Sequence, residues 1–92
     1  MYNGWTNHET WAKEAELANN SVLYTAAVKL VREATASSAK GTPARAAALT
    51  RLAVTMRSRF ARTAAERTMV NWQELAETWT DNLESSQPPR SS

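Results

Sequence analysis

Apolar side chains recur every three or four residues along much of this 92-residue chain, and this spacing is typical of amphipathic helices. Residues 21–36 carry one such row, made of Leu23, Ala27, Leu30, Val31 and Ala34. Residues 43–62 carry another, made of Leu49, Leu52, Ala53, Met56 and Phe60. The pattern predicts a helix over each range, and the second helix should be the longest in the chain.

Two segments near the chain ends, residues 2–11 and 70–79, share a helix-start pattern. In each, a polar N-cap is followed three residues later by glutamate, which is the capping-box spacing. The two pairs are Thr6 with Glu9 and Asn71 with Glu74. They predict a first helix over residues 7–18 and a last helix over residues 72–83.

Two more capping patterns lie in the middle of the chain. Thr42 precedes Pro43, and proline is favoured at the first position of a helix, so the long helix should begin there. Thr63 and Glu66 again have capping-box spacing, which predicts a kink or a short extra helix near residues 63–69.

Composition agrees with helices throughout, because the chain has many alanines but only two glycines and three prolines. Ninety-two residues is long enough for one core and too short for two. We therefore predict an all-α fold: a small four-helix single domain over residues 1–83. The polar, proline-containing tail over residues 84–92 should be disordered.

All four tryptophans fall inside the two terminal segments. A buried indole removes a large area from water, so these rings should join the two chain ends in one core. The predicted core side chains are Trp5, Trp11, Trp72, Trp79, Leu49, Met56 and Phe60. Tyr2 and Trp5 should fold back over the helices as a lid; the alternative is an exposed aromatic patch that binds a partner.

The net charge of +2 is small but unevenly distributed. Residues 40–67 hold seven basic side chains and one acid, whereas residues 68–92 hold four acids and one arginine. A basic middle helix beside an acidic last helix would partly neutralise itself. Counted at about 100° per residue, Arg51, Arg59 and Arg62 fall in one sector of the long helix, with Arg45 at its border and Arg57 elsewhere. These four, Arg45, Arg51, Arg59 and Arg62, are the candidate contacts with a partner; the alternative is an ordinary solvated surface.

Candidate catalytic and metal-binding groups are few. The chain has no cysteine and a single histidine, His8, beside Glu9, so no metal site, cofactor or enzymatic activity is expected. Glu74, Glu77 and Asp81 share one face of the last helix, and we expect them to face water or the arginines. With no long apolar run and no signal-peptide pattern, we expect a cytoplasmic protein without a membrane segment.

The terminal segments also carry a family resemblance. YNGWTNHETW at residues 2–11 resembles the opening of a family of small, functionally uncharacterised bacteriophage and mobile-element proteins, and VNWQELAETW at residues 70–79 resembles its closing stretch. The matching positions are Tyr2, Asn3, Gly4, Trp5, Asn7, Glu9, Thr10 and Trp11, then Val70, Asn71, Trp72, Glu74, Leu75, Ala76 and Glu77. Residues 12–17 depart from the family, because they are more polar than its aliphatic and tryptophan-containing run. The resemblance implies a phage setting and a small helical fold, and no activity, cofactor or binding residue.

We therefore expect a non-enzymatic module that binds a component of a host bacterium, either a protein or a ribonucleoprotein complex. In a phage setting, such a protein would act as an inhibitor of a restriction or CRISPR-type defence complex. The alternative is direct nucleic-acid binding by the basic helix over residues 43–62. A homo-oligomer, in which a second copy covers the apolar face of helix 21–36, is a further alternative.

Overall fold

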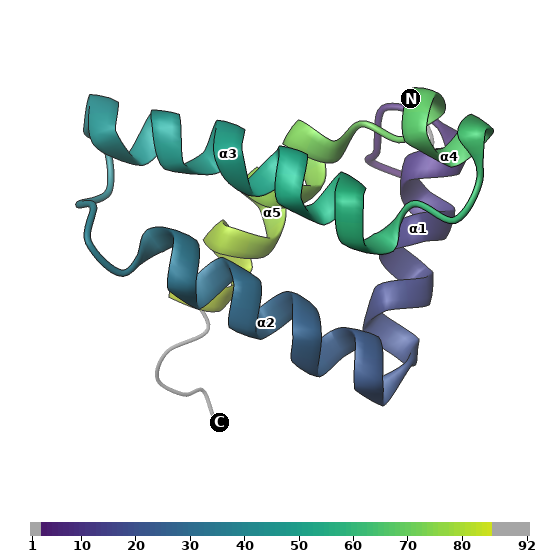
Figure 1. The fold of residues 1–92 in the computed structure, drawn as a ribbon, viewed down its shortest axis with the longest axis horizontal. Helices are drawn as coiled ribbons and strands as arrows, with labels where there is room; N and C mark the ends of the chain where they lie inside the picture. The colour runs from purple at the N-terminus through teal and green to yellow at the C-terminus, as the bar shows by residue number, and fades with distance from the viewer. Residues whose placement is uncertain (1–2, 86–92) are drawn as a thin grey trace.

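The computed structural model describes residues 3–85, which fold into five helices (Figure 1). They are α1 (His8–Asn19), α2 (Ser21–Thr35), α3 (Pro43–Phe60), α4 (Ala64–Met69) and α5 (Trp72–Ser85). This described range contains no strand, so the all-α prediction is confirmed, and the short helix near residues 63–69 is a separate element. The predicted tail began too early, because Glu84 and Ser85 form the end of α5; residues 86–92 lie outside the described range.

Side-chain caps were predicted for four helices, and those of α3, α4 and α5 are confirmed, but the cap of α1 is a different residue. The side chain of Asn7, not that of Thr6, accepts a hydrogen bond from the Thr10 backbone N–H at 2.9 Å. The predicted caps of α3 and α4 are present, since Thr42 accepts from Arg45 N–H and Thr63 accepts from Glu66 N–H. The α1 capping-box assignment to Thr6 was therefore wrong by one residue.

The long helix α3 ends at Phe60, two residues before its predicted end. Ala61 has extended backbone angles, φ −75° and ψ 123°, and its N–H still bonds to the Arg57 carbonyl. Thr63, the cap of α4, is extended as well. The chain must leave the helix before Thr63, because a capping residue has non-helical backbone angles.

In Figure 1, α2 and α3 lie side by side with antiparallel directions, α5 crosses behind them, and α1 and α4 stand together at one end. The most extensive helix contact is between α3 and α5. Twelve buried side chains form the core, and they come from every helix except α4: Leu17, Ala27, Val31, Leu52, Ala53, Met56, Phe60, Val70, Trp72, Leu75, Ala76 and Trp79, with Val70 in the α4–α5 linker.

The tryptophans do not share one environment. Trp72 and Trp79 are buried in the core, and Trp5 is half-buried and packs against it. Trp11 is half-buried and lies outside the core cluster, with its ring centroid 5.6 Å from that of His8. The core prediction is therefore wrong for Trp11, because the buried side of α1 is formed by Thr10, Lys13 and Leu17.

The other predicted core positions follow the helical pattern. Met56 is fully buried and Phe60 is 4% exposed, whereas Leu49 is half-buried and packs on the edge of the core. Tyr2, predicted to form part of a lid, lies outside the described residues.

The two terminal segments meet through hydrogen bonds between their helix starts, which we call the cap junction (Thr6, Asn7, Thr10, Asn71 and Glu74). Asn71 N–H donates to Thr10 Oγ1 at 2.8 Å, and Thr6 N–H donates to Glu74 Oε1 at 3.0 Å. Asn7 Nδ2 donates across the junction to the Met69 carbonyl at 2.8 Å. The chain's two ends thus meet through polar groups, and Trp5 packs against the core that contains Trp72 and Trp79.

Candidate partner-binding surface

Arg45, a predicted partner contact, belongs to the interior. It is 8% exposed, and its guanidinium donates to the Ser38 carbonyl at 2.6 Å, the Ser38 hydroxyl at 3.1 Å and the Thr35 carbonyl at 3.3 Å. Its Nη1 also forms an ion pair with Glu84 Oε2 at 2.8 Å. Arg45 therefore ties the end of α2 and the following loop to α5, and its assignment to a partner surface was wrong.

Arg62 lies beyond the end of α3 and is held by other side chains. Its guanidinium pairs with Glu16 Oε2 at 2.6 Å, and its backbone N–H donates to Glu66 Oε1 at 2.8 Å. The buried Lys13 lies beside this pair, with Nζ 2.7 Å from Glu16 Oε1 and 2.9 Å from Glu66 Oε1. We call these four residues the Lys13 network. Arg62 remains on the surface, but it does not share the face of α3 with Arg51.

Within the Lys13 network, the pKa of one carboxyl group, that of Glu66, is clearly shifted. The hydrogen bond from the Arg62 backbone N–H, together with the charges of Lys13 and Arg62, holds the pKa of Glu66 below its ordinary value, and partial burial opposes the shift. The network joins α1 to the α3–α4 linker and to α4. It is therefore a structural contact between helices.

Arg51 and Arg59 are both exposed on α3, as predicted, and neither forms an ion pair within residues 3–85. Arg57 is also exposed and forms no ion pair within residues 3–85, although it was predicted to lie outside the sector of the other arginines. The buried positions Leu52 and Met56 are the better reference, because they fix which side of α3 faces the core. Counted from them at about 100° per residue, Arg51 and Arg57 fall on the solvent-facing side of α3, whereas Arg59 falls within about 20° of Leu52 and is exposed in the last turn of the helix.

Small side chains fill the solvent-facing arc of α3 between Arg51 and Arg57. They are Ala47, Thr50, Val54 and Ser58, all exposed, with Val54 at 53%. We call these four residues with Arg51, Arg57 and Arg59 the α3 face. The 18-residue helix carries four arginines and no acidic residue. The α3 face is therefore a positively charged surface on which short side chains separate the arginines.

The acidic side chains of α5 do not neutralise the α3 face. Glu74 belongs to the cap junction, Glu77 accepts a hydrogen bond from Gln73 Nε2 at 2.9 Å, and Asp81 is exposed. Among the described residues, the ion pair between α3 and α5 is the buried one from Arg45 to Glu84. The expected neutralisation between these helices is thus limited to that pair.

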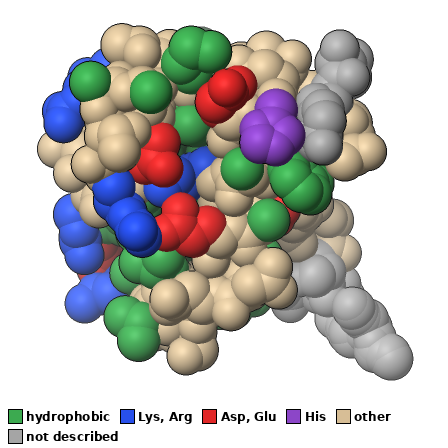
Figure 2. All heavy atoms as spheres, turned by 90° about the vertical axis from the view of Figure 1, so that its right-hand side faces the viewer, with side chains coloured by type: hydrophobic (Ala, Val, Ile, Leu, Met, Phe, Trp, Pro, Cys, Tyr) green, Lys and Arg blue, Asp and Glu red, His purple; other side chains and the backbone are tan. Residues whose placement is uncertain are grey.

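The distribution of charge is visible on the side of the molecule that carries α1 and α4. Figure 2 shows Lys and Arg side chains along the left edge of this view, on the side nearest α2 and α3, and acidic side chains closer to its middle. The acids of the Lys13 network, Glu16 and Glu66, already have partners in Lys13 and Arg62.

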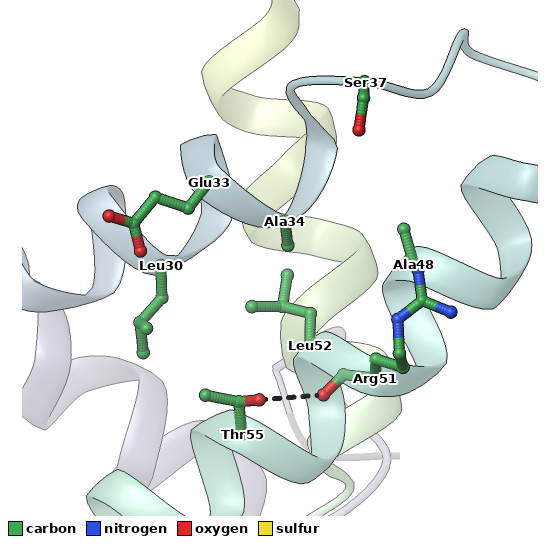
Figure 3. Close-up of a pocket in the computed structure, with 8 residues that line it drawn as sticks. All are labelled: Leu30, Glu33, Ala34, Ser37, Ala48, Arg51, Leu52 and Thr55. Carbon is green, nitrogen blue, oxygen red and sulfur yellow. Dashed lines mark hydrogen bonds between the residues drawn. The ribbon is translucent and has the colours of Figure 1, made fainter.

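A groove of about 410 Å³ lies between α2 and α3, beside the α3 face. Its lining consists of Leu30, Glu33, Ala34, Ser37, Ala48, Arg51, Leu52 and Thr55. In Figure 3, Leu30 from α2 and Leu52 from α3 both extend into the space between the two helices, while the side chains of Arg51 and Glu33 extend away from each other. The groove therefore offers an apolar floor with Arg51 at its α3 wall.

Residues 3–85 contain no group of three or more His, Cys, Asp or Glu side chains that could hold a metal ion. No helix among them is long and apolar enough to cross a membrane. Comparisons with protein-family models, curated proteins and solved structures find no match to this chain.

Proposed function

We propose that this protein is a non-enzymatic binding module that docks an acidic surface of a partner protein on its α3 face. The observation that carries the proposal is the acid-free α3 with three exposed arginines that have no ion pair within the described residues. Exposed, unpaired cations attract a surface of opposite charge and orient it during encounter.

The shape of the α3 face favours a protein over a nucleic acid. Ala47, Thr50, Val54 and Ser58 project little from the helix, so a partner's backbone can approach closely between the arginines. The neighbouring groove, with Leu30 and Leu52 at its floor, can receive an apolar side chain. Apolar contacts inside a charged rim are the usual arrangement of a protein interface.

The biological setting comes from the resemblance of the two terminal segments to bacteriophage and mobile-element proteins. In that setting, the partner is a component of the host bacterium, and the module acts in the host cytoplasm. The partner we propose is a protein or ribonucleoprotein complex of a restriction or CRISPR-type defence system, which the module inhibits by occupying its surface.

Charge reversal on the α3 face tests this proposal. The variant carrying Arg51→Glu, Arg57→Glu and Arg59→Glu should no longer capture host proteins that the wild-type chain captures from bacterial lysate, identified by mass spectrometry. The matched control carries Arg32→Glu, Lys40→Glu and Arg67→Glu, which change the net charge equally at exposed positions outside the α3 face. Equal loss in both variants, or in neither, would contradict the assignment.

Direct nucleic-acid binding by α3 is the second candidate function, because the same three guanidinium groups can contact phosphates. Three phosphate contacts predict that the logarithm of the binding constant falls with the logarithm of salt concentration at a slope of roughly −3. A gel shift with duplex and single-stranded DNA and RNA at about 50 mM salt distinguishes the two functions. Binding that the α3 reversal abolishes would support this candidate, and absence of any shift would leave the protein partner.

A further inference from the structure

A second cavity lies away from the α3 face, where α1, α2 and α5 converge. It has a volume of about 240 Å³ and is lined by Glu14, Ala18, Tyr24, Trp79, Asn82 and Leu83. No residue of α3 contributes to it. Most of its lining is apolar or aromatic, and Glu14 is its one acidic side chain.

Glu14 has no partner of its own. Its carboxyl group forms no hydrogen bond or ion pair with any residue from 3 to 85, and it is only half-exposed. Burial beside apolar groups raises the pKa of Glu14, because the charged form loses hydration. A cation placed in the cavity would restore the interaction that the carboxylate lacks.

Two aromatic rings form a wall of the same cavity. The centroids of Tyr24 and Trp79 lie 5.6 Å apart, with their planes inclined at 52°. Trp79 is 6% exposed and supports the wall from inside, whereas Tyr24 is 45% exposed and is accessible to a ligand. Cations are attracted to aromatic faces, and guanidinium groups also stack on them.

We propose that this cavity binds the side chain of an arginine supplied by a partner protein. The guanidinium would lie against the Tyr24 ring and donate to the Glu14 carboxylate, while its aliphatic stem would contact Ala18 and Leu83. Arginine fits better than lysine, because its planar group can stack and bind a carboxylate through two donors at once. The site thus recognises a charge opposite to the one recognised by the α3 face.

A small probe tests the cavity independently of the proposed function. The full-length protein is titrated with N-acetyl-arginine-N′-methylamide, and the NMR signal of the Trp79 indole N–H is followed. We expect a saturable shift of this signal, and a loss of affinity of about tenfold in Glu14→Gln, because hydrogen bonds to a charged group are the stronger ones. The matched control, Glu33→Gln, changes an exposed carboxylate outside this cavity and should bind as the wild type does.

Two further probes and one further variant give the results that would overturn the proposal. The blocked amides of lysine and norleucine should bind more weakly than the arginine probe, and Tyr24→Leu should weaken arginine binding. Equal binding of the norleucine probe would show a merely apolar cleft, and equal binding of the lysine probe would remove the preference for arginine. Unchanged affinity in Glu14→Gln would overturn the site as a whole.

The chain's own Arg90, outside the described residues, provides a competing occupant. If it filled the cavity, Arg90→Gln in the full-length protein would raise the affinity for the arginine probe. That result would overturn the assignment to a partner. Unchanged affinity in Arg90→Gln supports the partner as the source of the arginine.

Discussion

The first turn of α3 and the solvent face of the same helix use arginine in opposite ways. Arg45 donates to two backbone carbonyls, a serine hydroxyl and a carboxylate, and it is almost entirely buried. Arg51, two turns later, is exposed and has no ion pair in the described part of the chain. The two residues look alike in sequence. What separates them is whether acceptors from other elements lie within reach, and only the arginine without such acceptors is available to a partner.

The largest difference between these regions should appear in stability. Arg45→Met removes the donors of two carbonyls and leaves Glu84 unpaired, so it should lower the free energy of unfolding by about 3 kcal/mol. Arg51→Met should change it by less than about 0.5 kcal/mol, because surface substitutions without special contacts are nearly neutral. Urea unfolding followed by circular dichroism measures both.

The two methionine variants serve as controls for each other, since each removes one charge from the same helix. Similar stabilities of the two would mean that the bonds made by Arg45 are offset by the cost of burying its charge.

The second prediction extends the comparison from arginines to threonines. Thr10 is fully buried, and its hydroxyl both donates to Asn7 Oδ1 at 2.7 Å and accepts from Asn71 N–H at 2.8 Å. Thr10→Val keeps the shape but leaves both partners without this bond. We expect the free energy of unfolding to fall by about 2 kcal/mol, as for other buried groups that lose a partner.

Thr80 provides the matched case, because it is 1% exposed and its hydroxyl has no hydrogen-bond partner in the described structure. Thr80→Val should leave stability unchanged or raise it by up to about 1 kcal/mol, since an unpaired buried hydroxyl is a cost. Thermal and urea unfolding of both valine variants make the test. A loss at Thr80 equal to that at Thr10 would show that valine itself is disfavoured inside these helices.

The third prediction uses pH to compare Glu66 with Glu14. Folding lowers the pKa of Glu66. Its contribution to the free energy of unfolding is therefore complete above the ordinary pKa of 4.5, and it is lost as the pH falls below that value. Glu66→Gln should therefore be less stable than the wild type at pH 7, and the difference should shrink as the pH falls through this range. Urea midpoints between pH 7 and pH 3 measure it.

The pKa shift of Glu14 has the opposite direction to that of Glu66. Burial raises its pKa, so its charged form weakens the fold as the pH rises above 4.5. Glu14→Gln should be at least as stable as the wild type at pH 7, with a difference that also shrinks in acid. If the two glutamine variants shifted stability in the same direction at pH 7, the contrast between a partnered and an unpartnered carboxyl would be refuted.

Periodicity and capping chemistry predicted the helices well, because both depend on neighbours in sequence. Thr42, Thr63 and Asn71 cap as expected, and the buried rows through Val31 and Met56 follow the helical spacing. The α1 cap could not be chosen from local sequence, since Thr6 and Asn7 are both good caps. The choice follows from the cap junction, where the Thr6 hydroxyl accepts from Asn71 Nδ2, 65 positions away.

The candidate surface was predicted less completely, for the same reason. Nothing near Arg45 in sequence indicates that Glu84 and the Thr35 carbonyl would surround it. Spacing among the arginines grouped Arg59 with Arg51 and set Arg57 apart, whereas counting from the buried side chains places Arg51 and Arg57 together on the solvent side. Local rules identify which residues can bind, whereas the packing of helices decides which of them remain unoccupied.

The smallest expected effect is a difference in stability among the arginines of the α3 face. Arg57 and Arg59 lie in the last turn of α3, where a positive charge interacts favourably with the helix dipole, whereas Arg51 lies in mid-helix. Arg57→Ala and Arg59→Ala should each lower the free energy of unfolding by about 0.3–0.5 kcal/mol at low salt, and Arg51→Ala should have a smaller effect. Urea midpoints at low ionic strength and in about 1 M NaCl measure the difference, which should disappear in the concentrated salt because charges are screened within about 3 Å there. If the difference in stability persisted in concentrated salt, it would come from packing of the arginine stems instead of from charge. Arg57 and Arg59 would then be partly structural, and the proposal that they are free to contact a partner would be weaker.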